Sequence, residues 1–129
     1  MKKNILFVCI ENSSRSQLAQ AFAIMHGKEK VNAYSAGSKP SGVINLKAIA
    51  AMKELGYDLS AHKSKSLTEI PDVIYDYVIT MGCGDECPFI IGHHREEWNI
   101  PDPRNMNKGD FRNVRDFIAQ KVVSLLGKL

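Results

Sequence analysis

The chain has 129 residues, of which 44% are hydrophobic and 24% charged, which fits one globular domain over residues 1–129 and excludes a multidomain machine. Its 17 basic and 14 acidic residues are scattered along the chain and give a formal charge of only +3, which gives little support to nucleic-acid binding. The apolar run over residues 5–10 is far shorter than the ~20 residues that span a bilayer. We therefore expect a soluble, cytoplasmic monomer without a cleaved leader, which binds neither nucleic acid nor membrane.

Strand and helix signals alternate along the chain. The predicted elements are a strand over residues 3–9, a helix with Leu18, Phe22 and Met25 on one face, a strand over residues 31–36 closed by Gly37, a helix over residues 45–55, a strand over residues 75–81, a short strand near residues 97–100, and a closing helix with Phe111, Val114, Ile118, Val122 and Leu125 on one face. Ser13 or Ser14 is the expected N-cap of the first helix, and Gly27 its C-terminal cap.

This alternation predicts an α/β fold: a single-domain open four-stranded parallel sheet flanked by helices on both faces, with right-handed crossovers. Ligands of such sheets bind at the carboxyl ends of the strands. The loops that follow residues 9, 81 and 100 should therefore lie close together.

The loop after the first predicted strand is typical of an oxyanion cradle. Cys9 ends the strand and Arg15 follows six positions later, where a helix begins. Backbone N–H groups between them, the helix N-terminus and the guanidinium can all bind a tetrahedral oxyanion, and the same field favours the Cys9 thiolate. Asn12 suits a left-handed turn, and the Ser16 hydroxyl can donate to the sulfur. The predicted oxyanion-binding residues are Ile10, Glu11, Asn12, Ser13, Ser14, Arg15 and Ser16.

The alternative is a Cys9 that packs in the core and an Arg15 that is solvated in the first helical turn. The position of the motif between a predicted strand and a predicted helix favours the cradle. A second candidate group is Asp102, which stands between Pro101 and Pro103 in a stiff loop suited to a general acid, although an aspartate beside proline is also a common turn residue.

Cys83 and Cys87, separated by three residues, are the other two cysteines. They could form a disulfide if their loop brings them close enough. They could also join His93 and His94 in a zinc site, although adjacent histidines usually point in different directions. A stable structural disulfide is a third alternative, which a cytoplasmic setting disfavours. We predict no metal and no cofactor.

These motifs together resemble the low-molecular-weight tyrosine phosphatase fold and, within it, the thiol-dependent arsenate reductases, over nearly the whole chain. Residues 8–9, 12–13 and 15–17 resemble the family's phosphate-binding loop, residues 35–37 resemble the segment after its second strand, and residues 98–103 resemble the stretch that carries its Asp-Pro loop. Three departures are visible. Ser14 replaces a second cysteine, Gln20 and Lys65 replace acidic residues with which some relatives bind potassium, and Arg104 replaces a tyrosine that lines the phosphatase cleft.

The resemblance implies a reaction for the three thiols. Cys9 would attack arsenate while Asp102 donates a proton, Cys83 would attack Cys9 and release arsenite, and Cys87 would move the disulfide outward for thioredoxin to reduce. Phosphate or sulfate would compete with arsenate, and Gly82 and Gly84 would serve as hinges. Two alternatives stay open: a phosphatase that hydrolyses phosphomonoesters through a Cys9 phospho-enzyme, and a redox sensor in which Cys83 resolves an oxidised Cys9.

Overall fold

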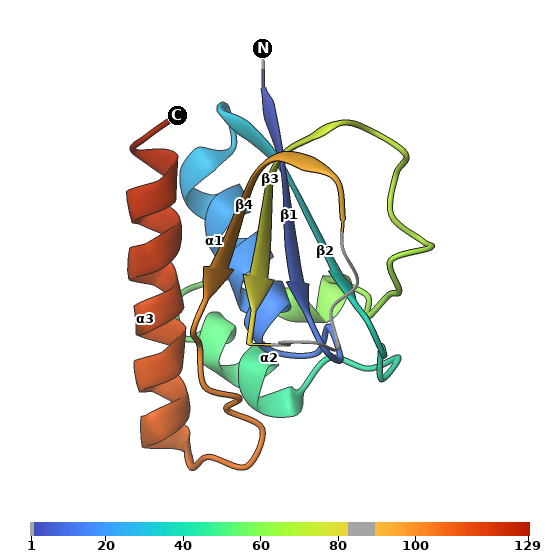
Figure 1. The fold of residues 1–129 in the computed structure, drawn as a ribbon. Coiled ribbons are helices and arrows are strands. Elements are labelled where there is room, and N and C mark those ends of the chain that lie inside the picture. Colours follow the sequence, from blue (N-terminus) through green and yellow to red (C-terminus); the bar gives the residue numbers. More distant parts are fainter. Residues whose placement is uncertain (1, 83–89) are drawn as a thin grey trace.

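The computed structural model describes residues 2–82 and 90–129, which contain four parallel strands and three α-helices (Figure 1). The elements in chain order are β1 (Lys3–Cys9), α1 (Arg15–Gly27), β2 (Val31–Gly37), α2 (Leu46–Lys53), the 3-10 turn η1 (Leu59–Ala61), β3 (Tyr75–Met81), β4 (Gly92–Trp98) and α3 (Lys108–Leu126). The strands pair in the order β2-β1-β3-β4. The predicted four-stranded parallel sheet is therefore confirmed.

The central strand β1 is buried on both of its faces, as its continuous apolar sequence predicts. Ile5 and Phe7 point into the larger core cluster, which also contains the buried side chains of all three α-helices. Leu6 and Val8 point to the opposite face. This alternation is the two-residue period of a strand.

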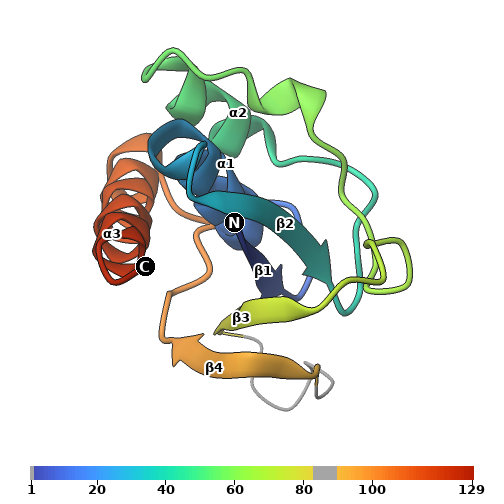
Figure 2. The ribbon, with the colours of Figure 1, turned by 90° about the horizontal axis from the view of Figure 1, so that it is seen from above.

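The described helices pack against one face of the sheet, whereas we expected helices on both faces (Figure 2). Among the described residues, the second face is covered by the long connection between η1 and β3, which contributes Leu67 and Ile70, and by Ile90, which precedes β4. An irregular segment that supplies a few apolar side chains can shield a face without forming a helix. None of the helices in residues 2–82 and 90–129 is long and apolar enough to cross a membrane.

The fourth strand begins earlier than predicted. The prediction missed its first residues because they are polar. We expected a short strand near residues 97–100, but β4 covers Gly92–Trp98 and ends two residues before Ile100. In the described part of the chain the strand lies at the sheet edge, pairs with β3 and leaves most of its side chains exposed. An edge strand of this kind lacks the apolar run on which the prediction depended.

The ends of α1 also differ from the predicted caps. Ser14 occupies the N-cap position but makes no side-chain capping hydrogen bond, and the helix ends at Gly27 with Lys28 still in a helical conformation. Gly27 serves packing instead, since a Cβ there would lie 2.7 Å from Leu126 Cδ2 of α3. Met25, predicted to face the core, is 36% exposed.

Candidate active site

The loop from Cys9 to Arg15 is held in a fixed curve by its neighbours. Asn12 is fully buried and has a φ of 50°, which confirms the predicted left-handed turn. Gly37, at the end of β2, lies so close that a Cβ there would be 2.5 Å from the Ile10 carbonyl oxygen. Only glycine therefore fits beside this loop, and the loop cannot shift toward β2.

Side-chain hydrogen bonds hold Asn12 from within α1. Gln17 Nε2 donates to the Asn12 backbone oxygen at 3.1 Å and to its Oδ1 at 2.8 Å. The Oδ1 also accepts from the backbone N–H of Lys65 at 3.0 Å. Asn12 Nδ2 in turn donates to Ser16 Oγ at 2.7 Å. The backbone oxygen and both polar side-chain atoms of Asn12 are thus hydrogen-bonded.

The Cys9 sulfur lies at the floor of the loop. The residue is only 3% exposed, and its Sγ lies 2.9 Å from Ser16 Oγ. Because Ser16 Oγ already accepts a hydrogen bond from Asn12, its own proton is free to donate to the sulfur. A donated hydrogen bond stabilises a thiolate, which is the nucleophilic form of cysteine.

The Arg15 side chain contacts the segments that follow β3 and β4. Its side chain is 6% exposed, its Nη1 donates to the Ile100 carbonyl oxygen at 3.1 Å, and its Nη2 lies 3.7 Å from Asp102 Oδ2. Gly82, directly after β3, lies against the same guanidinium and against Ile100. The loops after residues 9, 81 and 100 therefore meet, as the sequence predicts.

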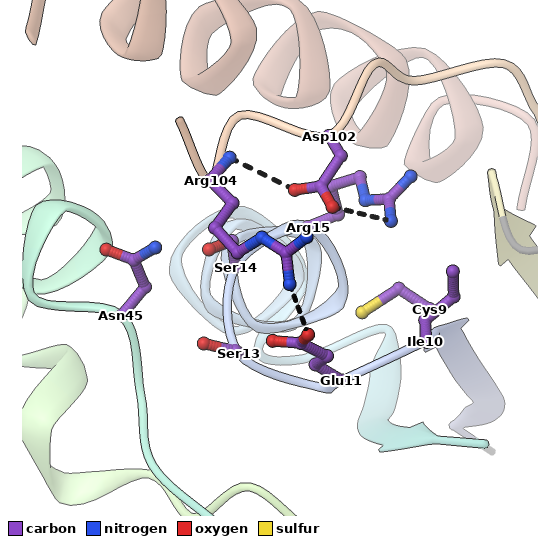
Figure 3. A pocket seen from close by; sticks show the side chains of 9 residues that line it. All are labelled: Cys9, Ile10, Glu11, Ser13, Ser14, Arg15, Asn45, Asp102 and Arg104. Atoms are coloured by element: carbon purple, nitrogen blue, oxygen red, sulfur yellow. Dashed lines mark hydrogen bonds and ion pairs between the residues drawn. The ribbon is translucent and has the colours of Figure 1, made fainter. Parts of the chain in front are cut away.

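Asp102 and Arg104 lie in the segment after β4. They face the loop from Cys9 to Arg15, which we call the anion loop. The Asp102 side chain is 46% exposed, and its Oδ1 accepts from the backbone N–H of Arg104 at 3.0 Å. Arg104 Nη1 extends to Glu11 Oε2, 2.6 Å away (Figure 3). The sequence does not predict this ion pair, because 93 positions separate its two members.

A pocket of about 220 Å³ opens above the Cys9 sulfur. Its lining residues are Cys9, Ile10, Glu11, Ser13, Ser14, Arg15, Asn45, Asp102 and Arg104 (Figure 3). Seven of these were expected as site residues, while Asn45 and Arg104 were not. Asn12 and Ser16 are buried beneath the loop and support it. A thiol, a guanidinium and a carboxylate at one concave site suit attack on a tetrahedral oxyanion.

A second group of polar residues supports Gln17 from outside α1. His62 Nδ1 lies 2.9 Å from Gln17 Oε1, and His62 Nε2 lies 2.6 Å from the Tyr57 hydroxyl. Gln17 Oε1 can only accept, so Nδ1 carries the proton and Nε2 accepts from Tyr57. Burial lowers the pKa of His62, which favours this neutral form. No role was predicted for His62, because no local pattern in the sequence indicates one.

The residues where some relatives hold potassium do not fit that ion here. Lys65 Nζ lies 3.4 Å from Ser35 Oγ and 3.2 Å from the Lys63 carbonyl oxygen. Ser35 Oγ donates to Gln20 Oε1 at 2.6 Å. An ammonium group beside these oxygens repels a further cation, although burial lowers the pKa of Lys65. The Lys65 ammonium group therefore makes these particular residues a poor site for potassium.

Cys83, Cys87 and Gly84 lie outside the described residues, so neither the thiol relay nor the zinc alternative is tested by geometry. His94, a member of the proposed zinc set, is engaged elsewhere: its Nε2 lies 3.0 Å from Glu96 Oε1, and its ring packs against Tyr77. Gly82, which immediately precedes Cys83, has a φ of 77°.

Known proteins are similar to this chain in sequence and in fold. Residues 4–129 match the family "Low molecular weight phosphotyrosine protein phosphatase". An arsenate reductase of Staphylococcus epidermidis is 40% identical over 125 residues, covering 94% of this chain and 93% of its own. A glutaredoxin arsenate reductase of Synechocystis sp. is 35% identical and covers 98% of both chains.

Solved structures agree with these relatives. A structure described as an arsenate reductase in the phosphate binding state has a TM-score of 0.87 and 34% identity, over 98% of both chains. A thioredoxin-dependent arsenate reductase of Corynebacterium glutamicum has a TM-score of 0.80 and 32% identity, over 98% of this chain and 61% of that one. The chain that surrounds the Cys9 pocket therefore belongs to the low molecular weight phosphotyrosine protein phosphatase family and, within it, to the arsenate reductases.

Proposed function

We propose that this arsenate reductase binds arsenate in the loop above Cys9 and reduces it to arsenite by a relay of three thiols. One observation carries the proposal: Cys9, Arg15 and Asp102 line a single pocket. The loop amides and the Arg15 guanidinium would hold the oxyanion, and phosphate or sulfate would compete because they share its shape and charge. We place the reaction in the cytoplasm, where thiols are kept reduced.

In the first step the Cys9 thiolate attacks arsenic. The arsenic–sulfur bond forms as one arsenic–oxygen bond breaks, and Asp102 gives a proton to the departing hydroxyl, which leaves as water. The 46% exposure of the Asp102 side chain supports this role, because the carboxylate can recover its proton from solvent. The product is a covalent adduct between Cys9 and arsenic(V).

In the second step the Cys83 thiolate attacks Cys9 Sγ. The sulfur–arsenic bond breaks and its electron pair stays on arsenic, so arsenic(V) becomes arsenic(III) and arsenite leaves. The two sulfurs are oxidised to a Cys9–Cys83 disulfide. Cys87 then attacks Cys83, which frees Cys9 and leaves a Cys83–Cys87 disulfide. The contact of Gly82 with Arg15 supports this sequence, since Cys83 directly follows a residue at the site.

Thioredoxin is the proposed reductant. A disulfide between two distal cysteines is a substrate for a dithiol protein, and the relative from Corynebacterium glutamicum is described as thioredoxin-dependent. The relative from Synechocystis is described as a glutaredoxin arsenate reductase, so both reductants belong in the test.

The decisive experiment measures arsenate-dependent NADPH consumption with thioredoxin and thioredoxin reductase, and in parallel with glutaredoxin, glutathione and glutathione reductase. We expect steady consumption by the wild-type chain with thioredoxin, and none by Cys9→Ser or Cys83→Ser. Consumption with glutaredoxin alone would move the reductant to that class. Consumption that persists in Cys83→Ser would contradict the relay.

A phosphatase activity is the second candidate, because the same thiol, guanidinium and carboxylate could hydrolyse a phosphomonoester with water as the final acceptor. The phosphatase reaction would not use the thiols of Cys83 and Cys87. Hydrolysis of an aryl phosphate at a rate equal in wild type and Cys83→Ser would identify it.

A further inference from the structure

An ion pair joins the two loops that face each other across the pocket. Arg104 Nη1 lies 2.6 Å from Glu11 Oε2, and both residues line the pocket with Cys9 (Figure 3). Glu11 belongs to the anion loop, whereas Arg104 belongs to the segment that carries Asp102. The pair therefore connects the loop of the proposed nucleophile to the loop of the proposed acid.

The backbone at each end of this pair is held in place. The Glu11 carbonyl oxygen accepts from the Ser41 backbone N–H at 3.1 Å and from Ser64 Oγ at 2.9 Å. On the other side, the Arg104 N–H donates to Asp102 Oδ1 at 3.0 Å, and Lys47 Nζ holds the Met106 carbonyl oxygen at 2.6 Å. An exposed ion pair is usually weak, because water screens the attraction and two long side chains must be ordered, but these fixed backbones keep the two residues within reach of each other.

The position of the pair matters for the shape of the ligand. A free oxyanion such as arsenate fits entirely within a cradle of loop amides and a guanidinium. A monoester of the same oxyanion carries an organic group, which must extend out through the mouth of the pocket while the ester is bound. Glu11 and Arg104 are the partly exposed, oppositely charged residues on either side of that mouth, with side chains 36% and 55% exposed.

We propose that the Glu11–Arg104 ion pair is a latch that selects free inorganic oxyanions over their organic monoesters. This inference rests on the proposed oxyanion site at Cys9 and adds the residues that set its substrate class. An organic group can enter only if the pair opens, whereas a free oxyanion binds with the pair closed. The latch is thus a specificity device outside the reacting atoms.

Charge has to be separated from shape in the test. Arg104→Gln leaves the Glu11 carboxylate unpaired beside the pocket and should lower the affinity for every anion. Glu11→Gln frees the Arg104 guanidinium and should raise that affinity. The double variant Glu11→Gln with Arg104→Gln removes the ionic tie without changing the net charge. Its ratio of affinities for two anions therefore reports on the latch alone.

The chain contains a matched control. Arg112 and Glu54 form an ion pair of the same length, 2.6 Å, with side chains 47% and 40% exposed. This pair connects α3 to the residue after α2, and neither residue lines the Cys9 pocket. Arg112→Gln should therefore leave anion selectivity unchanged.

The experiment measures binding of inorganic phosphate and of phenylphosphonate to the reduced, full-length chain by titration calorimetry. We expect the wild type to prefer phosphate, and the double Gln variant to shift the affinity ratio about three- to fivefold toward phenylphosphonate, the scale of one partly exposed ion pair. The charge-swapped chain, Glu11→Arg with Arg104→Glu, should recover the wild-type ratio. Circular dichroism checks that each variant folds.

Each outcome separates the latch from the site beneath it. If the double variant keeps the wild-type ratio of affinities for phosphate and phenylphosphonate, the latch is overturned and the proposed site stays intact. The same conclusion follows if Arg112→Gln shifts this ratio as much as the double variant does. A wild-type chain that binds no phosphate overturns both proposals. A shifted ratio in a chain that does not reduce arsenate would retain the latch and contradict only the reductase mechanism.

Discussion

The Arg15 guanidinium is fixed by the Ile100 carbonyl oxygen, to which its Nη1 donates at 3.1 Å. Asp102 Oδ2 lies 3.7 Å from Nη2 of the same guanidinium. The basic group that would hold the oxyanion is therefore placed by the loop that carries the proposed acid. A change in the geometry of either one should be transmitted to the other.

Arg15→Lys tests this dependence. Lysine keeps the positive charge but lacks the planar fork that can bind Ile100 and an oxyanion together. The loss of two charge-assisted hydrogen bonds, each worth roughly 1.5–3 kcal/mol, predicts a fall in kcat/KM for arsenate of at least about 100-fold. Steady-state kinetics measure this value. A loss below tenfold would mean that charge alone holds the anion.

Gly82→Ala should distort the same site from the end of β3. The residue has a φ of 77°, and a Cβ there would clash with the Arg15 guanidinium and lie 2.9 Å from the Ile100 carbonyl oxygen. We expect the strained φ to lower the free energy of unfolding by about 1–2 kcal/mol. The displaced Arg15 should lower kcat/KM on the order of tenfold to 100-fold.

Gly56→Ala is the matched control for this variant. Gly56 has a similar φ of 80°, but a Cβ there would meet nothing within 4 Å. It should therefore lose comparable stability, measured by urea unfolding, with unchanged kinetics. Equal kinetic losses in the two variants would assign the effect to stability and not to the site.

The sequence predicted the parts of the site that local signals encode. Cys9 at a strand end, Asn12 in a left-handed turn and Arg15 at a helix start all lie within one short segment. The parallel topology then predicted that the loop carrying Asp102 would meet that segment. These inferences needed only hydrophobic periodicity and the geometry of strand ends.

Side-chain pairs between distant segments had no such signal. Glu11 meets Arg104 across 93 positions, and Gln17 meets His62 across 45. Glu11 was expected in the oxyanion loop and Arg104 beside the cleft, but the sequence around each side chain does not indicate its partner. The edge strand β4 was misplaced for a related reason, because its exposed residues leave no apolar pattern.

Cys87→Ser should stop the relay after about one turnover. With Cys87 absent, the Cys9–Cys83 disulfide cannot be passed outward, so arsenite release should equal the amount of enzyme and then cease. Intact mass and peptide mapping would find a Cys9–Cys83 disulfide. The matched variant Cys83→Ser should release no arsenite, and normal cycling of Cys87→Ser with thioredoxin would contradict the relay.

The last prediction concerns stability below neutral pH. Burial lowers the pKa of His62 in the folded chain, with a smaller contribution from Lys65 and an opposing one from Asp58. In the unfolded chain the imidazole titrates near its ordinary value of about 6.5. The unfolded state therefore binds a proton first as the pH falls, so His62 contributes stability above about pH 6.5 that is lost below it.

His62→Gln should reduce this loss. Glutamine cannot be protonated, so the free energy of unfolding of this variant should fall less steeply than that of the wild type between about pH 7.5 and 5. At pH 7.5 the variant should be less stable by about 1 kcal/mol, since it disturbs the contacts of His62 with Gln17 and Tyr57. Urea unfolding at each pH measures both quantities. His93→Gln, on the exposed edge strand, is the control, and parallel curves for His62→Gln and wild type would show that His62 does not titrate on unfolding.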